Sequence, residues 1–251
     1  QDMSGFKLNK WHIKEVKDFD FKLQYNDDFP VANATIKDFI EEDGKSGLLI
    51  LWGEKGTGKT TYIRHLISSY PNKKFVFIPS NLITMLGDPS FGNFLLSLQN
   101  SIIILEDCEA VIRSRKSNSS ASAVSLLLNM GDGLMSDDLG IKFICTFNEE
   151  VTNIDEALMR KGRLACMYEF KKLTADKVSV LLPKVVENKI AEYEAKITEA
   201  GDDTDKVNRI NEKIEKLKNI FNYSNFKNMT LADIYNVEDD SFIKETKKIG
   251  F

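Results

Sequence analysis

The sequence predicts an α/β fold in which a five-stranded parallel sheet is flanked by helices and followed by a small α-helical domain with a helical hairpin. Two observations lead to this prediction. Apolar runs of strand length alternate with helical patterns up to residue 171, and beyond that position only helical patterns continue. Continuous apolar strands separated by helices are typical of a parallel sheet that is covered on both faces.

The expected elements of the sheet follow one another in a regular order. Strands are expected at 47–52, 74–79, 101–106, 141–147 and 165–170, and helices at about 59–69, 90–99, 120–134 and 155–160. In such a sheet, right-handed crossovers bring the carboxyl ends of several strands to one edge, where ligands bind. A ligand site is therefore expected at that edge.

The pattern divides the chain into an N-terminal extension (1–46), a core (47–171) and a helical domain (172–251). In the extension, polar and apolar residues alternate around WHIKEVKDFDFKLQY, which predicts a hairpin that leans on the sheet. A helix is expected after it, at about 35–42.

The helical domain contains two stretches in which apolar residues recur at spacings of three and four. The sequence Gly-Asp-Asp at 201–203 lies between them and is a turn signal. Together they predict an antiparallel helix hairpin over 184–222. Its charged outer faces fit either a pair of solvated lid helices or an arm that contacts a neighbour or partner.

The composition favours a soluble globular protein. Its 251 residues are 42% hydrophobic and 29% charged, which suffices for one substantial core and a smaller companion. A net charge of -4 and a pI near 5.4 argue against a protein that mainly grips a nucleic-acid backbone. The apolar runs are shorter than a membrane span, and the three cysteines lack the spacing of metal ligands. We expect buried cysteines and a reducing, cytoplasmic location.

The stretch GEKGTGKT at 53–60 joins an expected strand to an expected helix. It matches G-x-x-x-x-G-K-[ST], which favours a phosphate-binding loop over a flexible turn. Glycines let consecutive backbone N–H groups surround an anion, and the following helix points its positive end at the same place. Lys59 can then reach the β- and γ-phosphates, and the Thr60 hydroxyl can bind Mg²⁺. The residues expected to hold ATP are Gly53, Glu54, Lys55, Gly56, Thr57, Gly58, Lys59, Thr60 and Thr61.

Two adjacent acids, Glu106 and Asp107, follow the apolar run IIIL. Hydrolysis needs a group that holds the metal from the side opposite the phosphate loop and a group that activates water. Adjacent carboxylates point in different directions, so one can hold Mg²⁺ while the other polarises the attacking water. Alternatively, the two acids only cap a helix after a core strand.

Beyond these motifs, the chain resembles the AAA+ ATPases over about 47–236. The strand FICTFN ends at Asn148, which corresponds to the polar sensor at the tip of the fourth strand. IDEALMRKGR (154–163) resembles the second region of homology, which carries a pair of arginines. TLADI (230–234) resembles the opening of the sensor-2 helix, with Thr230 as its N-cap.

The resemblance implies a role for each residue of the site. Glu106 takes the position of the metal-side acid, and Asp107 takes that of the catalytic base, although it is one methylene shorter than the usual Glu. Asn148 orients the attacking water or the γ-phosphate. Arg160 and Arg163 act as fingers toward the nucleotide of a neighbouring subunit, unless salt bridges merely fix their loop. The Glu-Asp order and IDEALMRKGR are most similar to the branch of the mitochondrial complex III assembly chaperone.

The same resemblance implies ATP and Mg²⁺ as cofactors, a homo-oligomer in the form of a hexameric ring, and a protein client. Two features depart from the family. The pore loop of threading members is matched only in part by Met85-Leu86-Gly87, and Phe91-Gly92 lies near the following helix. No arginine precedes TLADI in the sensor-2 position, so the lid is expected to sense nucleotide through packing or backbone contacts.

Alternative functions follow from these departures. The weak pore loop favours an assembly switch that ATP controls and that threads nothing. The basic cluster RSRK (113–116) would suit a nucleic-acid-dependent motor or loader, which the acidic balance disfavours. A P-loop kinase would have no use for Asn148 or the paired arginines.

Overall fold

The computed structural model of the chain describes ten stretches of residues. They are 8–10, 12–13, 19–80, 82, 89–108, 139–148, 160, 162–201, 203–220 and 227–238. The chain divides into two compact units. The sheet unit comprises Gln1–Phe19, Asp27–Glu54 and Lys59–Phe170, and the helical unit comprises Asp20–Asn26, Lys55–Gly58 and Lys171–Phe251. The division therefore passes through the glycine-rich loop, whose tip groups with the helical unit.

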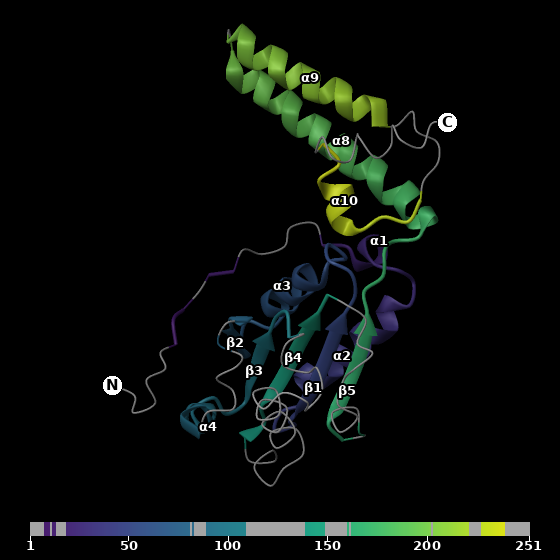
Figure 1. Cartoon of the computed structure of the whole chain (residues 1–251). Coiled ribbons are helices and arrows are strands. Elements are labelled where there is room, and N and C mark those ends of the chain that lie inside the picture. Colours follow the sequence, from purple (N-terminus) through teal and green to yellow (C-terminus); the bar gives the residue numbers. More distant parts are fainter. Residues whose placement is uncertain are drawn as a thin grey trace. The chain divides into compact units, whose positions relative to one another are not determined.

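The sheet unit contains a parallel sheet with the strand order β2-β3-β4-β1-β5 (Figure 1). The strands are β1 (Gly47–Trp52), β2 (Lys74–Ile78), β3 (Ser101–Leu105), β4 (Lys142–Phe147) and β5 (Leu164–Glu169). All the pairings between them are parallel. The predicted fold class is confirmed, and each strand begins and ends within one residue of its predicted position.

Buried side chains on one face of the sheet form a continuous core with α4 (Pro89–Leu96). Leu48, Ile103 and Phe143 contribute to it from three neighbouring strands. All five residues of β3 are buried, because this strand lies between two others inside the sheet. Phe91 of α4 belongs to the same core and is only 2% exposed.

Two helices pack together through aromatic side chains elsewhere in the sheet unit. They are α2 (Phe29–Glu41) and α3 (Lys59–Ser69). The ring of Phe29 meets that of Tyr62 edge to face at 4.9 Å, and the Tyr62 hydroxyl donates to Asn33 at 2.8 Å. Helix α3 has its predicted bounds, whereas α2 begins six residues before the predicted start at 35. Proline in the first turn explains this, since its fixed φ suits a helix start.

The described part of the N-terminal extension contains a short helix where a hairpin was predicted. This helix, α1 (Phe21–Gln24), belongs to the helical unit. The Asp20 side chain caps it by accepting from the Lys22 backbone N–H at 2.9 Å. A local cap thus overrides the alternating pattern. The helix predicted at 120–134 lies outside the described residues, and so do residues 155–159 of the helix predicted at 155–160.

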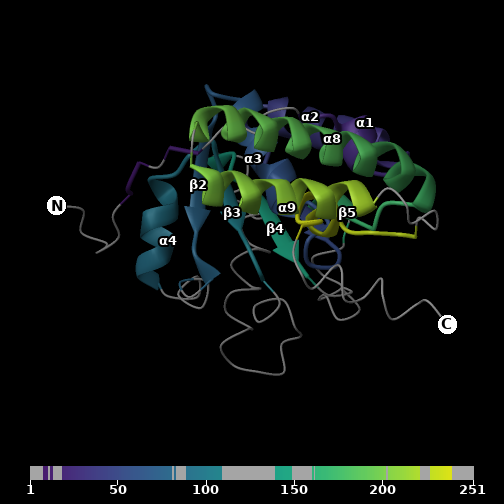
Figure 2. The ribbon, with the colours of Figure 1, turned by 90° about the horizontal axis from the view of Figure 1, so that it is seen from above.

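The helical unit contains the predicted hairpin, made of α8 (Ala175–Ala200) and α9 (Thr204–Ile220). The two helices lie side by side in both views (Figures 1 and 2). Their apolar stripes supply buried residues such as Val186, Ile210 and Leu217. Helix α10 (Leu231–Tyr235) begins with a capping box, in which the Thr230 hydroxyl accepts from the Asp233 N–H at 3.1 Å. The predicted N-cap at Thr230 is therefore confirmed.

The three cysteines are buried to different degrees. Cys108 and Cys145 are buried and Cys166 is partly buried, and burial raises the pKa of the Cys166 thiol. None of the described helices combines the length and the apolar character that a membrane span requires.

Candidate functional site

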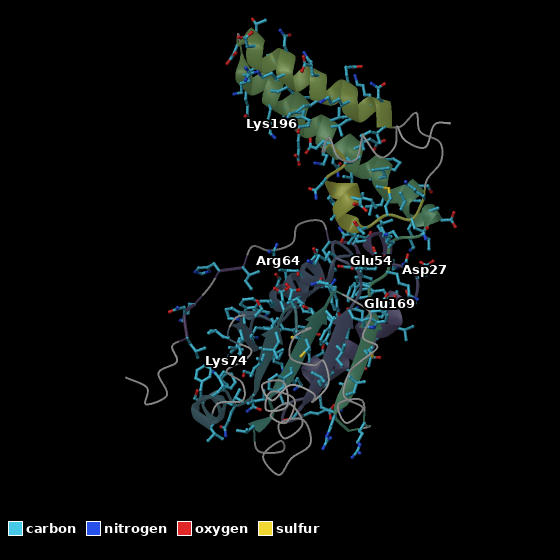
Figure 3. All side chains as sticks on the ribbon, viewed as in Figure 1. Asp27, Glu54, Arg64, Lys74, Glu169 and Lys196 are labelled. Atoms are coloured by element: carbon cyan, nitrogen blue, oxygen red, sulfur yellow. The ribbon has the colours of Figure 1, made fainter. Side chains whose placement is uncertain are left out.

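The glycine-rich loop leaves the carboxyl end of β1 and leads into α3. Figure 3 labels Glu54 in this loop and Lys74 at the start of β2, and the two mark opposite ends of the sheet. Gly53, Gly56 and Gly58 all have positive φ angles, of 138°, 82° and 99°. The loop thus follows a path that other residues rarely adopt, as the glycine pattern in the sequence predicts.

Gly53 is fixed in place by the end of β5. A Cβ atom at this position would lie 2.1 Å from the backbone oxygen of Phe170, so only glycine fits. The Gly53 N–H donates to the Phe147 carbonyl at 3.2 Å. The first residue of the loop is therefore held by neighbours on both sides, since β1 lies between β4 and β5.

The Lys59 side chain turns back beneath the loop. Lys59 is 7% exposed, and its Nζ donates to the carbonyls of Gly53 at 2.7 Å and Glu54 at 3.0 Å. A buried ammonium needs hydrogen-bond partners. The two carbonyl oxygens solvate the buried ammonium.

Thr60 and Glu106 lie against each other at the same edge of the sheet. The Thr60 hydroxyl, in the first turn of α3, donates to Glu106 Oε1 at 2.8 Å. Glu106 follows directly after β3, and Thr60 is exposed while Glu106 is partly buried. A hydroxyl and a carboxylate at this distance offer two hard oxygen donors to a divalent cation, which is the donor type that Mg²⁺ prefers.

Asp107 contacts the end of the neighbouring strand β4. Its carboxylate accepts from the Asn148 side-chain amide at 2.5 Å. Its backbone has a φ of 56°, which is uncommon for a residue other than glycine. The Asp107 N–H donates to the Thr146 hydroxyl at 3.2 Å. The two adjacent acids thus have different partners, Thr60 for the first and Asn148 for the second.

Arg160 and Arg163 lie at the opposite end of the sheet from these groups. Arg163 directly precedes β5, and its carbonyl accepts from the N–H of Leu48 at the start of β1 at 2.8 Å. The loop begins at Gly53, five residues after Leu48. At about 3.3 Å per residue of a strand, Gly53 lies about 17 Å farther along β1. Arg160 is exposed and Arg163 is partly buried. The structure therefore does not bring either arginine to the loop of its own chain.

The other candidate residues lie within the loop or outside the described part of the chain. Lys55 is exposed, Thr57 is buried and Thr61 is partly buried. The possible pore-loop residues Met85–Gly87 and the basic cluster at 113–116 fall on residues that the structure does not describe.

Within the helical unit, the tip of the loop (Lys55–Gly58) makes two hydrogen bonds that the sequence did not predict. The N–H of Ala232, in α10, donates to the Gly56 carbonyl at 2.9 Å, and the Tyr25 hydroxyl donates to the Gly58 carbonyl at 3.0 Å. Because no arginine stands in the sensor-2 position, the lid was expected to sense nucleotide through packing or backbone contacts, whereas this backbone contact is with the loop itself. No signal pointed to Tyr25, which lies in the segment that was predicted as a hairpin.

Comparison with known families identifies the region that contains this site. Residues 49–172 match the family described as "ATPase family associated with various cellular activities (AAA)". The match supports an ATPase of the AAA+ type that binds a nucleotide. It does not extend to the branch of the complex III assembly chaperone. No curated protein matches the chain significantly.

We expect Gly53→Ala to destabilise the sheet unit because the added methyl group meets the Phe170 backbone oxygen. The loss should be about 3 kcal/mol or more in the free energy of unfolding, as overpacking adds to the strain of a positive φ. Gly44→Ala is the matched control, since its φ is 73° and no atom lies within 4 Å of the new methyl group. It should lose only about 1–2 kcal/mol. Equal losses in urea unfolding without nucleotide would contradict this packing.

Proposed function

We propose that this chain, with its AAA match over 49–172, is an ATPase that binds and hydrolyses Mg-ATP at subunit interfaces. The energy would drive the remodelling or assembly of a macromolecular client, which we take to be a protein. The observation that carries the proposal is the hydrogen bond between Thr60 and Glu106 beside the buried Lys59. It joins a phosphate-binding pattern to a metal-binding acid, as ATP hydrolysis requires.

In the proposed function, Lys59 binds the β- and γ-phosphates of ATP. Its ammonium exchanges one or both of its carbonyl partners, Gly53 and Glu54, for phosphate oxygens. This exchange is favourable because a hydrogen bond between charged groups is about twice as strong as one to a neutral acceptor. The backbone N–H groups of the loop and of the first turn of α3 complete the phosphate site.

Thr60 and Glu106 would hold Mg²⁺ in the nucleotide complex. Their two oxygens fit a cation that keeps several waters and binds through one or two protein groups plus substrate phosphates. When bound, the metal neutralises charge that develops on the phosphates. Thr60 and Glu106 would also fix the position of the phosphate end relative to Asp107.

Asp107 would act as the general base toward the attacking water. Asp107 directly follows Glu106, the metal-side acid. Its carboxylate accepts a hydrogen bond from the Asn148 amide, which fixes it at the carboxyl end of the strands. A water that donates to Asp107 gains nucleophilicity as its proton moves toward the carboxylate. Asn148 orients this base and the water, and it can contact the γ-phosphate.

Arg160 and Arg163 support action at a subunit interface. Both lie at the amino end of β5, and the nucleotide loop lies at the other end of the sheet. A finger must touch the transferred phosphate, so in this mechanism it serves the nucleotide of a neighbouring subunit. We propose a ring, with six subunits as the expected number. Arg160 is the stronger candidate because it is exposed.

A protein is the proposed client. A protein client fits the acidic composition, which disfavours a nucleic-acid motor. An assembly switch that threads nothing is the second candidate, and the partial match of Met85-Leu86-Gly87 to a pore loop favours it. The Glu106-Asp107 order is the basis for proposing the branch of the complex III assembly chaperone.

The proposed function predicts that Lys59→Ala loses ATP turnover, because the variant lacks the charge nearest the β- and γ-phosphates. Lys45→Ala is the control. Lys45 is an exposed lysine whose ion pair with Glu42 lies before the start of β1. Phosphate release should fall to background in the first variant and stay at the wild-type rate in the second. Normal turnover by Lys59→Ala would contradict the proposed phosphate site.

The proposed interface predicts that two inactive variants restore activity to each other. Lys59→Ala has a defective loop and an intact finger, and Arg160→Ala has the reverse. Alone, Arg160→Ala should bind ATP but turn it over about 10³-fold more slowly. Mixed in equal amounts, the two should recover part of the wild-type rate, and wild-type specific activity should rise with protein concentration. The interface would be refuted by co-assembled mixtures that stay inactive, or by a fully active dilute monomer.

A further inference from the structure

We propose that Thr146 is a positioning residue for ATP hydrolysis, because it holds Asp107 in the backbone turn that presents its carboxylate. This inference rests on the proposed function, in which Asp107 is the general base. Thr146 lies in β4 and is 2% exposed. It therefore cannot act on substrate directly, and it was not among the residues that the motifs singled out.

Thr146 binds the backbone directly after the end of the neighbouring strand β3. The β3 and β4 ladder ends at the pair Leu105 and Cys145. The next residue of β4, Thr146, then binds two successive amides beyond the ladder. Its hydroxyl accepts from the Asp107 N–H at 3.2 Å, and its carbonyl accepts from the Cys108 N–H at 3.0 Å. One residue thus fixes the backbone on both sides of the Asp107 Cα atom.

These bonds act at a residue with an unfavourable backbone conformation. Asp107 has a φ of 56°, in the left-handed region. Among residues with a side chain, Asn and Asp adopt this region more often than others do. Such a conformation persists only where the surroundings hold it. The two bonds to Thr146 hold it, and the Cys108 thiol adds a bond to the Leu105 carbonyl at 3.1 Å.

The turn gives the two acids their separate partners. In a continued strand, residues 106 and 107 would point to opposite faces of the sheet. In the turn, Glu106 meets Thr60 while the Asp107 carboxylate accepts from Asn148. Loss of the turn should therefore displace the base and leave the metal-side pair in place. The same constraint accounts for the short acid at position 107, since Asp tolerates a positive φ better than Glu does.

The test compares Thr146→Val with Thr146→Ser. Valine keeps the shape of threonine but removes the hydroxyl, so the Asp107 N–H loses its acceptor, while serine retains one. We expect kcat to fall about tenfold or more in Thr146→Val, with the affinity for an ATP analogue within about twofold of wild type. Thr146→Ser should keep most of the wild-type kcat.

The control for a purely structural loss is Ser101→Ala. Ser101 is also fully buried, and its hydroxyl donates to the Leu98 carbonyl at 2.5 Å at the other end of β3. It should lose stability without a selective fall in kcat. Wild-type kcat in Thr146→Val, or equal falls in all three variants, would overturn the positioning role. A wild-type protein that hydrolyses no ATP would instead overturn the proposed function, so the two failures are distinguishable.

Discussion

The hydrogen bond between the Thr60 hydroxyl and Glu106 connects the start of α3 to the end of β3. It depends on the parallel sheet, because only parallel strands bring the loop after β1 and the acids after β3 to the same edge. It also depends on the glycines that let the loop turn back over Lys59. The function proposed for this chain uses this geometry to place the phosphates next to Mg²⁺.

Much of the fold could be predicted because the strands are short and the inner strands are buried. A run such as SIIIL at 101–105 has no polar side that would suit a solvated element, so it indicates a strand inside a sheet. The extension was harder, since alternation over a few residues also occurs in irregular chain. There, a single capping bond at Asp20 gives a helix at 21–24 instead of a predicted strand.

The site was predictable to the extent that local sequence determines it. Lys59, Thr60 and Glu106 occupy motif positions, and motifs record spacing along the chain. Thr146 was not predictable in this way, because its role depends on the register between β3 and β4. An apolar strand that contains one threonine does not show which amide the hydroxyl will meet. Tyr25 was missed for the same reason, as its partner Gly58 is far away in sequence.

In the proposed mechanism Glu106 and Asp107 have separate tasks, and the Mg²⁺ dependence of ATP binding and hydrolysis in two variants tests this separation. Asp107→Asn should bind ATP with the wild-type Mg²⁺ requirement and fail to hydrolyse it. Glu106→Gln should need about tenfold more Mg²⁺ for ATP binding and for hydrolysis, because the variant loses a charged metal ligand. The two acids would not have these tasks if Asp107→Asn hydrolysed ATP normally while Glu106→Gln was inactive with an unchanged Mg²⁺ requirement.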